Sequence, residues 1–297
     1  MKIYNDKNKV IIDGLKDFEP KHIFECGQCF RWTKENDDSY TIVAFGKILN
    51  VKKEENTIYF NNTNIYDFEN IWHNYFDLDR DYSRIKEILR KKDNYLDEAV
   101  KFGYGIRILN QDPWETIISF IISANNRIPM IKKAIDNLST YYGEEIGEFN
   151  GKKYYSFPTI EKMNSLSVEE IEKASTGYRA TYIKDTSYIV FSKQINIYNL
   201  KNVDTNMCKS HLMMFPGVGP KVADCIMLFS MQKYDVFPVD VWVQRVMKEF
   251  YLNEDMSLPK IRQYGIEKFK ELSGFAQQYL FYYARELGIG TSSRRRS

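Results

Sequence analysis

Lys221 is the residue whose type and setting best suit nucleophilic chemistry. It follows Pro216-Gly217-Val218-Gly219-Pro220, at the point where a predicted helix ending at Phe215 gives way to a second helix. The glycines favour a tight hairpin, which puts Lys221 in a first helical turn. The helix dipole disfavours a cation there. With partial burial we therefore expect a lowered pKa and an amine able to form a Schiff base. The alternative is a solvated surface lysine beside a phosphate.

Asp240 lies nineteen positions later, in Phe237-Pro238-Val239-Asp240-Val241-Trp242, just before a predicted helix over 243–250. An isolated Asp at such a place is most often only an N-cap. A carboxylate at that helix start can also face Lys221 across a groove. There it would stabilise positive charge that develops on a sugar, as in glycoside cleavage.

The turn between the two helices is itself a predicted anion site. Backbone N–H groups around Gly217 and Gly219 would face outward at a helix N-terminus, where phosphate binds readily. The pattern over 212–226 is typical of a helix-hairpin-helix, the DNA-binding motif, with Phe215 where Leu is usual. An ordinary pair of packed helices is the alternative.

Cysteine and histidine do not predict a metal site. Cys26 and Cys29 form a C-x-x-C, but Cys208 and Cys225 are isolated, and the three histidines show no ligand spacing. We therefore expect no metal held by side chains and no required cofactor. The four thiols also do not form a disulfide framework in a chain of 297 residues.

The elements that must position these residues fall into two parts. Short alternating runs between residues 10 and 60, among them 28–32, predict an antiparallel sheet. Helical spacing follows over 65–76 and 82–100, and we expect both stretches to cover the sheet. Asp112-Pro113 then starts a helix that is apolar nearly all round and therefore central. The fold class is α+β, with an N-terminal sheet domain over 1–110, an all-helical domain over 111–290 and a basic tail over 291–297.

Composition sets further limits on function. The net charge is +2 and the isoelectric point is about 8.1, so bulk charge alone does not hold this chain to nucleic acid. A local basic face remains compatible with these values. There is no apolar run long enough to span a membrane and no signal peptide. We expect a cytoplasmic protein, associated with the nucleoid if it is prokaryotic.

The lysine motif, followed by Pro-Val-Asp, resembles the helix-hairpin-helix DNA glycosylase superfamily. The fuller similarity is to the 8-oxoguanine DNA glycosylase/AP lyases, and it covers most of the chain. Gly27-Gln28-Cys29-Phe30-Arg31-Trp32 is similar to that family's G-Q-x-F-R-W. Further motifs follow in the family's order: Gln111-Asp112-Pro113, Ser123-Ala124-Asn125-Asn126, Gly177-Tyr178-Arg179-Ala180 and Phe275-Ala276-Gln277-Gln278-Tyr279-Leu280-Phe281.

The resemblance implies a role for each matching residue. Lys221 would attack C1′ of the damaged nucleotide, and Asp240 would assist. The base would be recognised by Gly27 (its carbonyl accepting from N7–H), Gln277 (reading the Watson–Crick edge), and Phe281 with Cys225 (holding the flipped base between them). Asn125 would fill the hole in the duplex, with Tyr178 as wedge and Arg179 on the partner base. Hairpin carbonyls of Met213, Phe215 and Val218 would be candidates for a structural cation.

Two positions depart from the family pattern. Met130 stands where many members have an arginine that reads the cytosine opposite the lesion, and Trp242 stands where many have a histidine. Methionine donates no hydrogen bond, and bidentate base reading is worth about 1–3 kcal/mol of discrimination. We therefore expect a relaxed preference for the opposite base.

The predicted partner is double-stranded DNA containing 8-oxoguanine. We expect the protein to be a monomer and not to bind a membrane. Two alternatives stay open. One is a helix-hairpin-helix glycosylase for another damaged base, although alkyl-base enzymes of the superfamily generally lack the lysine. The other is a non-catalytic DNA-binding module, which would leave Lys221 and Gln277 unexplained.

Overall fold

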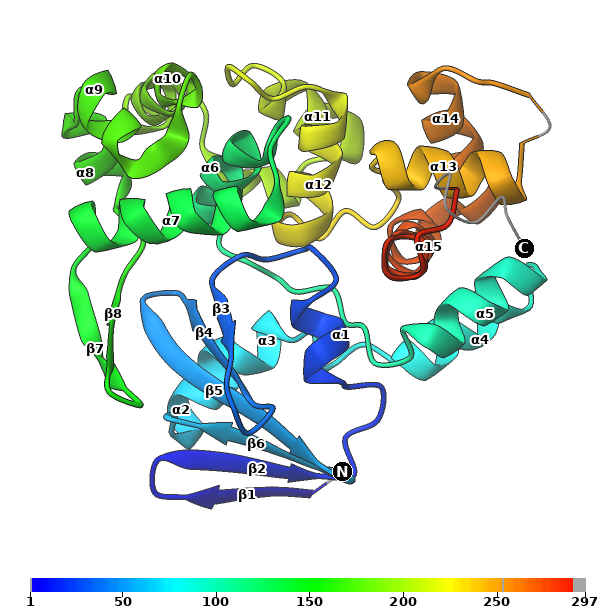
Figure 1. The fold of residues 1–297 in the computed structure, drawn as a ribbon, viewed down its shortest axis with the longest axis horizontal. Coiled ribbons are helices and arrows are strands. Elements are labelled where there is room, and N and C mark those ends of the chain that lie inside the picture. The colour runs from blue at the N-terminus through cyan, green and yellow to red at the C-terminus, as the bar shows by residue number, and fades with distance from the viewer. Residues whose placement is uncertain (1, 253, 291–297) are drawn as a thin grey trace.

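A computed structural model describes residues 2–252 and 254–290 (Figure 1). Its N-terminal part is an antiparallel sheet with the strand order β1-β2-β6-β5-β4-β3. The strands are β1 (Lys2–Asp6), β2 (Lys9–Asp13), β3 (Trp32–Lys34), β4 (Tyr40–Ala44), β5 (Lys47–Glu54) and β6 (Thr57–Asn61). The β4–β5 turn has positive φ at Phe45 and Gly46, which is the geometry that matches strand twist in a two-residue hairpin.

One face of this sheet is buried with the expected period of two. Val10 and Ile12 on β2 alternate with less buried neighbours, and Ile58 and Phe60 on β6 do the same. The short helices α1 (Pro20–Phe24), α2 (Ile65–Asp67) and α3 (His73–Tyr75), with the π-helical turn η1 (Phe68–Trp72), cover that face. The prediction that 65–76 covers the sheet is therefore confirmed.

The next two helices pack against the helical domain and not against the sheet. α4 (Tyr82–Arg90) and α5 (Asn94–Phe102) were expected to cover the sheet as well, and that expectation is wrong. Their apolar residues, Ile85, Leu89 and Leu96 among them, belong to the core of the helical domain, against α15 (Ser273–Leu287). The face of the sheet that carries Val10 and Ile12 is already covered by the short helices, so this second amphipathic stripe packs elsewhere.

The second domain is built around α6 (Pro113–Ser123), which is buried on nearly all sides as expected. The Asp112 side chain caps it by accepting from the Glu115 N–H at 2.9 Å. The helices of this domain before the hairpin are α7 (Ile128–Tyr142), α8 (Ile160–Ser165), α9 (Val168–Ile171), η2 (Glu172–Thr176), α10 (Arg179–Phe191), η3 (Ile197–Asn202) and α11 (Thr205–Leu212). Those after it are α12 (Pro220–Ser230), α13 (Val241–Phe250), α14 (Leu258–Phe269), η4 (Lys270–Leu272) and α15.

This domain is not all-helical, contrary to expectation. Strands β7 (Glu145–Phe149) and β8 (Lys152–Tyr155) form a hairpin after α7. Phe149 and Tyr154 pack against Val43 and Ile48, so the hairpin reaches back to the N-terminal sheet. Asn150 and Gly151 both have positive φ, and Asn-Gly is a strong local signal for a two-residue hairpin turn.

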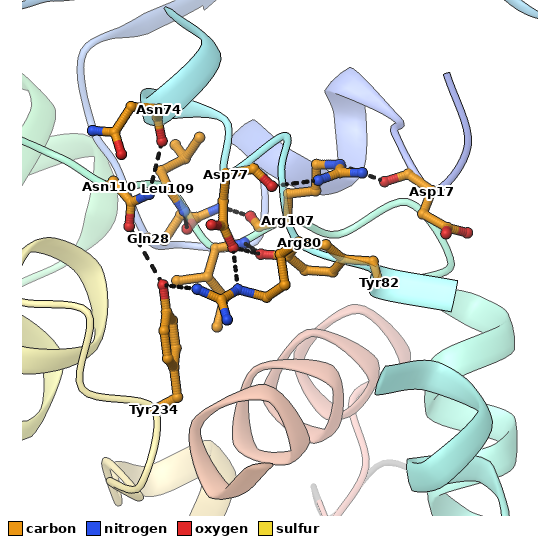
Figure 2. A network of polar contacts seen from close by, with 11 residues as sticks. Asp17, Gln28, Asn74, Asp77, Arg80, Tyr82, Arg107, Leu109, Asn110 and Tyr234 are labelled. Atoms are coloured by element: carbon orange, nitrogen blue, oxygen red, sulfur yellow. Dashed lines mark hydrogen bonds and ion pairs between the residues drawn. The ribbon is translucent and has the colours of Figure 1, made fainter. Parts of the chain in front are cut away.

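A polar network joins the two parts where residues 103–112 cross between them (Figure 2). The buried Arg107 donates to the carbonyls of Asp17 and Asp77 at 2.9 and 2.7 Å. The Asp77 carboxylate accepts from Arg80 and Tyr82, and Arg80 also reaches the Tyr234 hydroxyl at 3.0 Å. These bonds tie Arg107 of the connection to the N-terminal part and tie Arg80 of that part to Tyr234 of the helical part.

Three expectations of the sequence remain to be placed. Residues 28–31, predicted as part of a strand, form a loop, and β3 begins only at Trp32. The division at residue 110 stays a prediction, and the basic tail lies outside the described residues. Among those residues, no helix is long and apolar enough to cross a membrane.

Candidate active site

The hairpin that carries Lys221 has the predicted form. α11 ends at Leu212, three residues before the predicted end at Phe215. The Val218 N–H closes a turn on the Phe215 carbonyl at 3.1 Å, and Pro220 opens α12. Gly217 has φ +80°, and a Cβ there would lie 2.6 Å from Cδ2 of Tyr182. Both the left-handed backbone and the close approach require glycine. Lys221 therefore sits in the first turn of α12, half-buried.

The surroundings of Lys221 are mixed apolar and ionic. Its Nζ lies 5.7 Å from the ring centre of Phe120, which packs in turn against Phe30 of the N-terminal domain. Burial raises the pKa of the Cys225 thiol to about 11; the Lys221 ammonium opposes this rise and the Asp240 carboxylate adds to it. One buried, neutral thiol thus has both predicted catalytic groups as electrostatic neighbours.

Asp240 is the N-cap of α13, so the simpler of its two predicted roles is present. Its Oδ1 accepts from the Val243 N–H at 2.8 Å. The same carboxylate acts electrostatically on Cys225 one turn beyond Lys221. Capping fixes the orientation of the side chain, and a carboxylate so held can also stabilise a nearby positive charge.

Three of the residues predicted to recognise the base, Gly27, Gln277 and Phe281, lie where α15 meets the loop after α1. A Cβ at Gly27 (φ +83°) would lie 3.1 Å from Cε1 of Phe281. Gln277 lies one turn before Phe281 and is buried, and its Oε1 has no hydrogen-bond partner within residues 2–252 and 254–290. α12 and α15 meet directly at Leu228 and Gly274, where a Cβ would come within 2.4 Å of Leu228.

The loop of Gly27 is held rigidly from both sides. The Gln28 amide donates to the carbonyls of Ile23 and Arg107, both at 2.8 Å, and accepts from the Leu109 N–H at 2.9 Å. Gln278 of α15 donates to the Cys26 carbonyl at 2.7 Å. The G-Q pair of the sequence motif therefore combines the predicted recognition residue Gly27 with the Gln28 amide that holds its loop in place.

The residues predicted for the opposite strand lie together at the start of α7 and α10. Asn125 has φ +50°, and with Asn126, Arg127 and Met130 it lines an open hollow. Met130 is 45% exposed and Tyr178 is 58% exposed.

Arg179 differs from these neighbours, because it is buried. Its guanidinium donates to the carbonyls of Ala124, Asn125 and Thr176. In this structure it positions the Asn125 turn, and its role on the partner base stays a prediction.

The remaining predicted features are quickly placed. Cys26 and Cys29 are both buried and free, and burial raises the pKa of each thiol. Within the described residues no three His, Cys, Asp or Glu side chains cluster as metal ligands. The Phe215 carbonyl accepts from Val218, and the cation proposed at this hairpin stays a prediction. Trp242 packs under the Arg245 guanidinium at 4.9 Å from its ring centre.

Two further residues lie near the site: Asp224, which the sequence indicates as a local structural carboxylate rather than a catalyst, and Arg285, which sequence reasoning did not single out. Asp224 is fully buried between Lys209 and Arg262, which join it from α11 and α14. Arg285 reaches from α15 across Phe281 to the Gly27 loop. The second has a sequence signal, because Arg285 follows Phe281 by four residues, the spacing of one helix face.

Comparison with known proteins matches both parts of this architecture. The family model of the 8-oxoguanine DNA glycosylase N-terminal domain matches residues 10–117. The model of the HhH-GPD superfamily of base excision DNA repair proteins matches residues 118–277.

One solved structure and two curated proteins are similar to this chain. The chain is similar to the Clostridium acetobutylicum 8-oxoguanine glycosylase/lyase, solved in complex with double-stranded DNA containing cytosine opposite 8-oxoguanine. The identity is 50%, covering 97% of this chain and 99% of that one, with a TM-score of 0.95. The probable N-glycosylase/DNA lyase of Methanothermobacter thermautotrophicus is 30% identical over 72% of this chain and 74% of that protein. The N-glycosylase/DNA lyase OGG1 of Arabidopsis thaliana is 35% identical over 64% of this chain, and the match spans 55% of the plant protein's length.

Proposed function

Since the chain belongs to the HhH-GPD superfamily of base excision DNA repair proteins, we propose that it is an 8-oxoguanine DNA N-glycosylase with AP lyase activity. The observation that carries this proposal is the position of Lys221. Its amine stands in the first turn of α12 beside Cys225, and Cys225 belongs to the core against which Phe281 packs. A lysine that only contacts a phosphate would stand in solvent, whereas Lys221 is half-buried.

The proposed reaction uses Lys221 as nucleophile. The unprotonated Nζ attacks C1′, and the bond from C1′ to N9 breaks, so the base leaves with the electron pair and takes up a proton. Asp240 stabilises the positive charge on the sugar as that bond breaks. The sugar ring then opens to a Schiff base. Loss of a C2′ proton expels the 3′ phosphate, and water hydrolyses the Schiff base to free Lys221.

Recognition follows from residues on both domains. The Gly27 carbonyl accepts from N7–H, which 8-oxoguanine has and guanine lacks. Guanine would instead set two acceptors against each other, which costs free energy when water is excluded. Gln277 Oε1, buried without a partner, accepts from the Watson–Crick edge. Phe281 and Cys225 hold the flipped ring, and the raised pKa keeps that thiol neutral.

Backbone contacts would anchor the DNA. The N–H groups at Gly217, Gly219 and the start of α12 have no acceptor within the helix and suit phosphates. Asn125 and Tyr178 would enter the duplex at the vacated position. We propose a monomer that acts on double-stranded DNA in the cytoplasm, and gel filtration with and without a duplex tests that stoichiometry.

Borohydride trapping tests the chemistry. Wild-type protein on a duplex with one 8-oxoguanine should give a covalent protein–DNA adduct and a nicked strand. Lys221→Gln should bind the duplex but give neither product. Lys260→Gln is the matched control, because Lys260 is an exposed lysine in the first turn of α14. An adduct retained in Lys221→Gln would remove Lys221 from its role.

The same duplex tests the opposite-base proposal. Met130 stands exposed in the hollow formed with Asn125, Asn126 and Arg127, and its thioether offers no donor to a base. Single-turnover excision should therefore differ little among the four opposite bases. Excision opposite cytosine that is far faster than opposite the other three would contradict this.

A further inference from the structure

Three side chains of α15 follow one another at a spacing of four residues. Gln277, Phe281 and Arg285 therefore lie on one side of the helix, one turn apart. Phe281 is beside Gly27, and Gln277 and Arg285 stand on either side of it along the helix. The sequence prediction used the first two residues of this row and not the third.

Both flanking residues carry a buried polar atom that has no partner among the described residues. On Gln277 this is Oε1, a hydrogen-bond acceptor, and on Arg285 it is Nη1, a donor. Buried polar atoms in folded proteins are nearly always hydrogen-bonded, so each exception needs an explanation. Here the two exceptions flank the same aromatic ring and have opposite hydrogen-bonding character.

The guanidinium of Arg285 is fixed in place by its other contacts. Nη2 donates to the Glu25 carbonyl and pairs with Glu286 at 2.8 Å. The guanidinium lies 5.3 Å from the ring centre of Phe281. Nη1 is left at the Gly27 loop, 3.1 Å from the position that a Gly27 Cβ would take. The unpartnered donor and the proposed N7–H acceptor therefore belong to the same corner of the site.

A flat ligand stacked on Phe281 would satisfy both atoms if it carried a donor at one edge and an acceptor at the other. An oxidised purine has this pattern. Its Watson–Crick edge offers N1–H and N2–H to Gln277. Its other edge presents N7–H between the carbonyl oxygens O6 and O8.

We propose that Arg285 is a specificity-determining residue, whose Nη1 donates to a carbonyl oxygen that flanks N7 of the flipped base. The inference rests on the proposed function and extends it. Gly27 reads the hydrogen on N7, and Arg285 reads an oxygen next to it. A charge-assisted bond of this kind is stronger than a neutral one, and the planar guanidinium holds its direction.

Single-turnover excision by Arg285→Met tests this. The substrates are 8-oxoguanine, its 6-thio analogue and 8-thioguanine, since sulfur accepts hydrogen bonds weakly. The variant should excise 8-oxoguanine 10- to 100-fold more slowly, which is about 1.4–2.8 kcal/mol. Sulfur at the contacted position should slow the wild type but not the variant. Strand cleavage at a preformed abasic site should stay within about twofold, because no base is present there.

Gln278→Met is the matched control. It removes the other bond from α15 to the same loop, the one to the Cys26 carbonyl, without touching an unpartnered atom. This variant should slow the excision of all three bases by one common factor.

The alternative is that Arg285 only anchors the loop. Arg285→Met would then resemble Gln278→Met, with equal loss on all three bases, and this result overturns the proposal. If Arg285→Met does not fold, Arg285→Lys replaces it, because lysine keeps the charge but not the planar guanidinium. The wild-type protein alone is also decisive, because equal excision rates on the three bases would refute the contact. Failure of the proposed function is distinct, because the wild type itself would then release no 8-oxoguanine.

Discussion

Asp224 tests whether a buried carboxylate near Lys221, the proposed nucleophile, stabilises the fold or takes part in the reaction. It lies one turn after Lys221 and is fully buried. Oδ1 accepts from Lys209 at 2.9 Å and from Arg262 Nη2 at 3.1 Å, and Oδ2 accepts from Arg262 Nε. This carboxylate therefore joins α11, α12 and α14, and we expect it to stabilise the fold rather than to take part in the reaction.

Asp224→Asn keeps the volume of the side chain and removes its charge. Two cations then face each other without a counterion, and breaking a buried ion pair in this way costs about 3–5 kcal/mol. The side chains of Lys209 and Arg262 retain 17% and 23% exposure, so both can turn towards water. We therefore expect the lower end, about 3 kcal/mol, or roughly 6–12 °C in Tm for a domain of this size.

Thermal unfolding and single-turnover excision, measured on the same preparations, check this. Asp235→Asn is the control, because Asp235 is exposed and its carboxylate accepts only from Thr205. Asp224→Asn should melt early yet keep its excision rate per folded molecule at a temperature well below its Tm. Unchanged melting together with lost excision would refute the reasoning and make Asp224 part of the chemistry.

Three further outcomes are expected. Gly27→Ala adds a Cβ at φ +83°, 3.1 Å from Phe281. Excision of 8-oxoguanine should therefore fall at least ~10-fold while cleavage at an abasic site persists. Loss of both activities would indicate a folding defect. Burial raises the pKa of Glu115 from 4.5 to about 7, although the Arg31 guanidinium lies 3.5 Å away and opposes the rise. Folding therefore favours the protonated acid, and the free energy of unfolding falls as pH rises from 4.5 to about 7. Glu115→Gln should weaken that fall, seen as urea midpoints closer together at pH 5 and pH 8 than in wild type; an unchanged pH slope would place the titration elsewhere. Met130→Arg introduces a hydrogen-bond donor in the hollow that Met130 lines with Asn125, Asn126 and Arg127. The ratio of the excision rate opposite cytosine to the rate opposite adenine should rise about 10-fold. An unaltered ratio would mean that the side chain at position 130 does not contact the opposite base.

The parts of the site that local sequence determines were predictable. Asp112-Pro113 specifies a helix start through capping and a preset φ, and the structure has that start. The glycines of the hairpin specify a turn, which places Lys221 by local geometry alone. Asp240 likewise precedes a helix and caps it. In each case the determining interactions span four residues or fewer.

What could not be predicted depends on which surfaces meet. The amphipathic pattern of α4 and α5 shows that one stripe is buried but not against what, and the stripe packs on α15. Asp224 gave no sign of its two cations, because Arg262 is 38 residues away. Arg179 looks like an exposed basic residue in sequence, and only the fold supplies the carbonyls of Ala124 and Asn125 that bury it.

The loop from Cys26 to Phe30 lies on the seam between two apolar cores. Cys26 and Phe30 are buried in the core that carries Lys221, whereas Cys29 is buried in the core of the sheet. In the proposed reaction, the nucleophilic amine and the carbonyl that accepts from N7–H thus come from different domains of the chain. On that proposal, substitutions in one short loop would change which lesion is accepted without altering the helix that carries the amine.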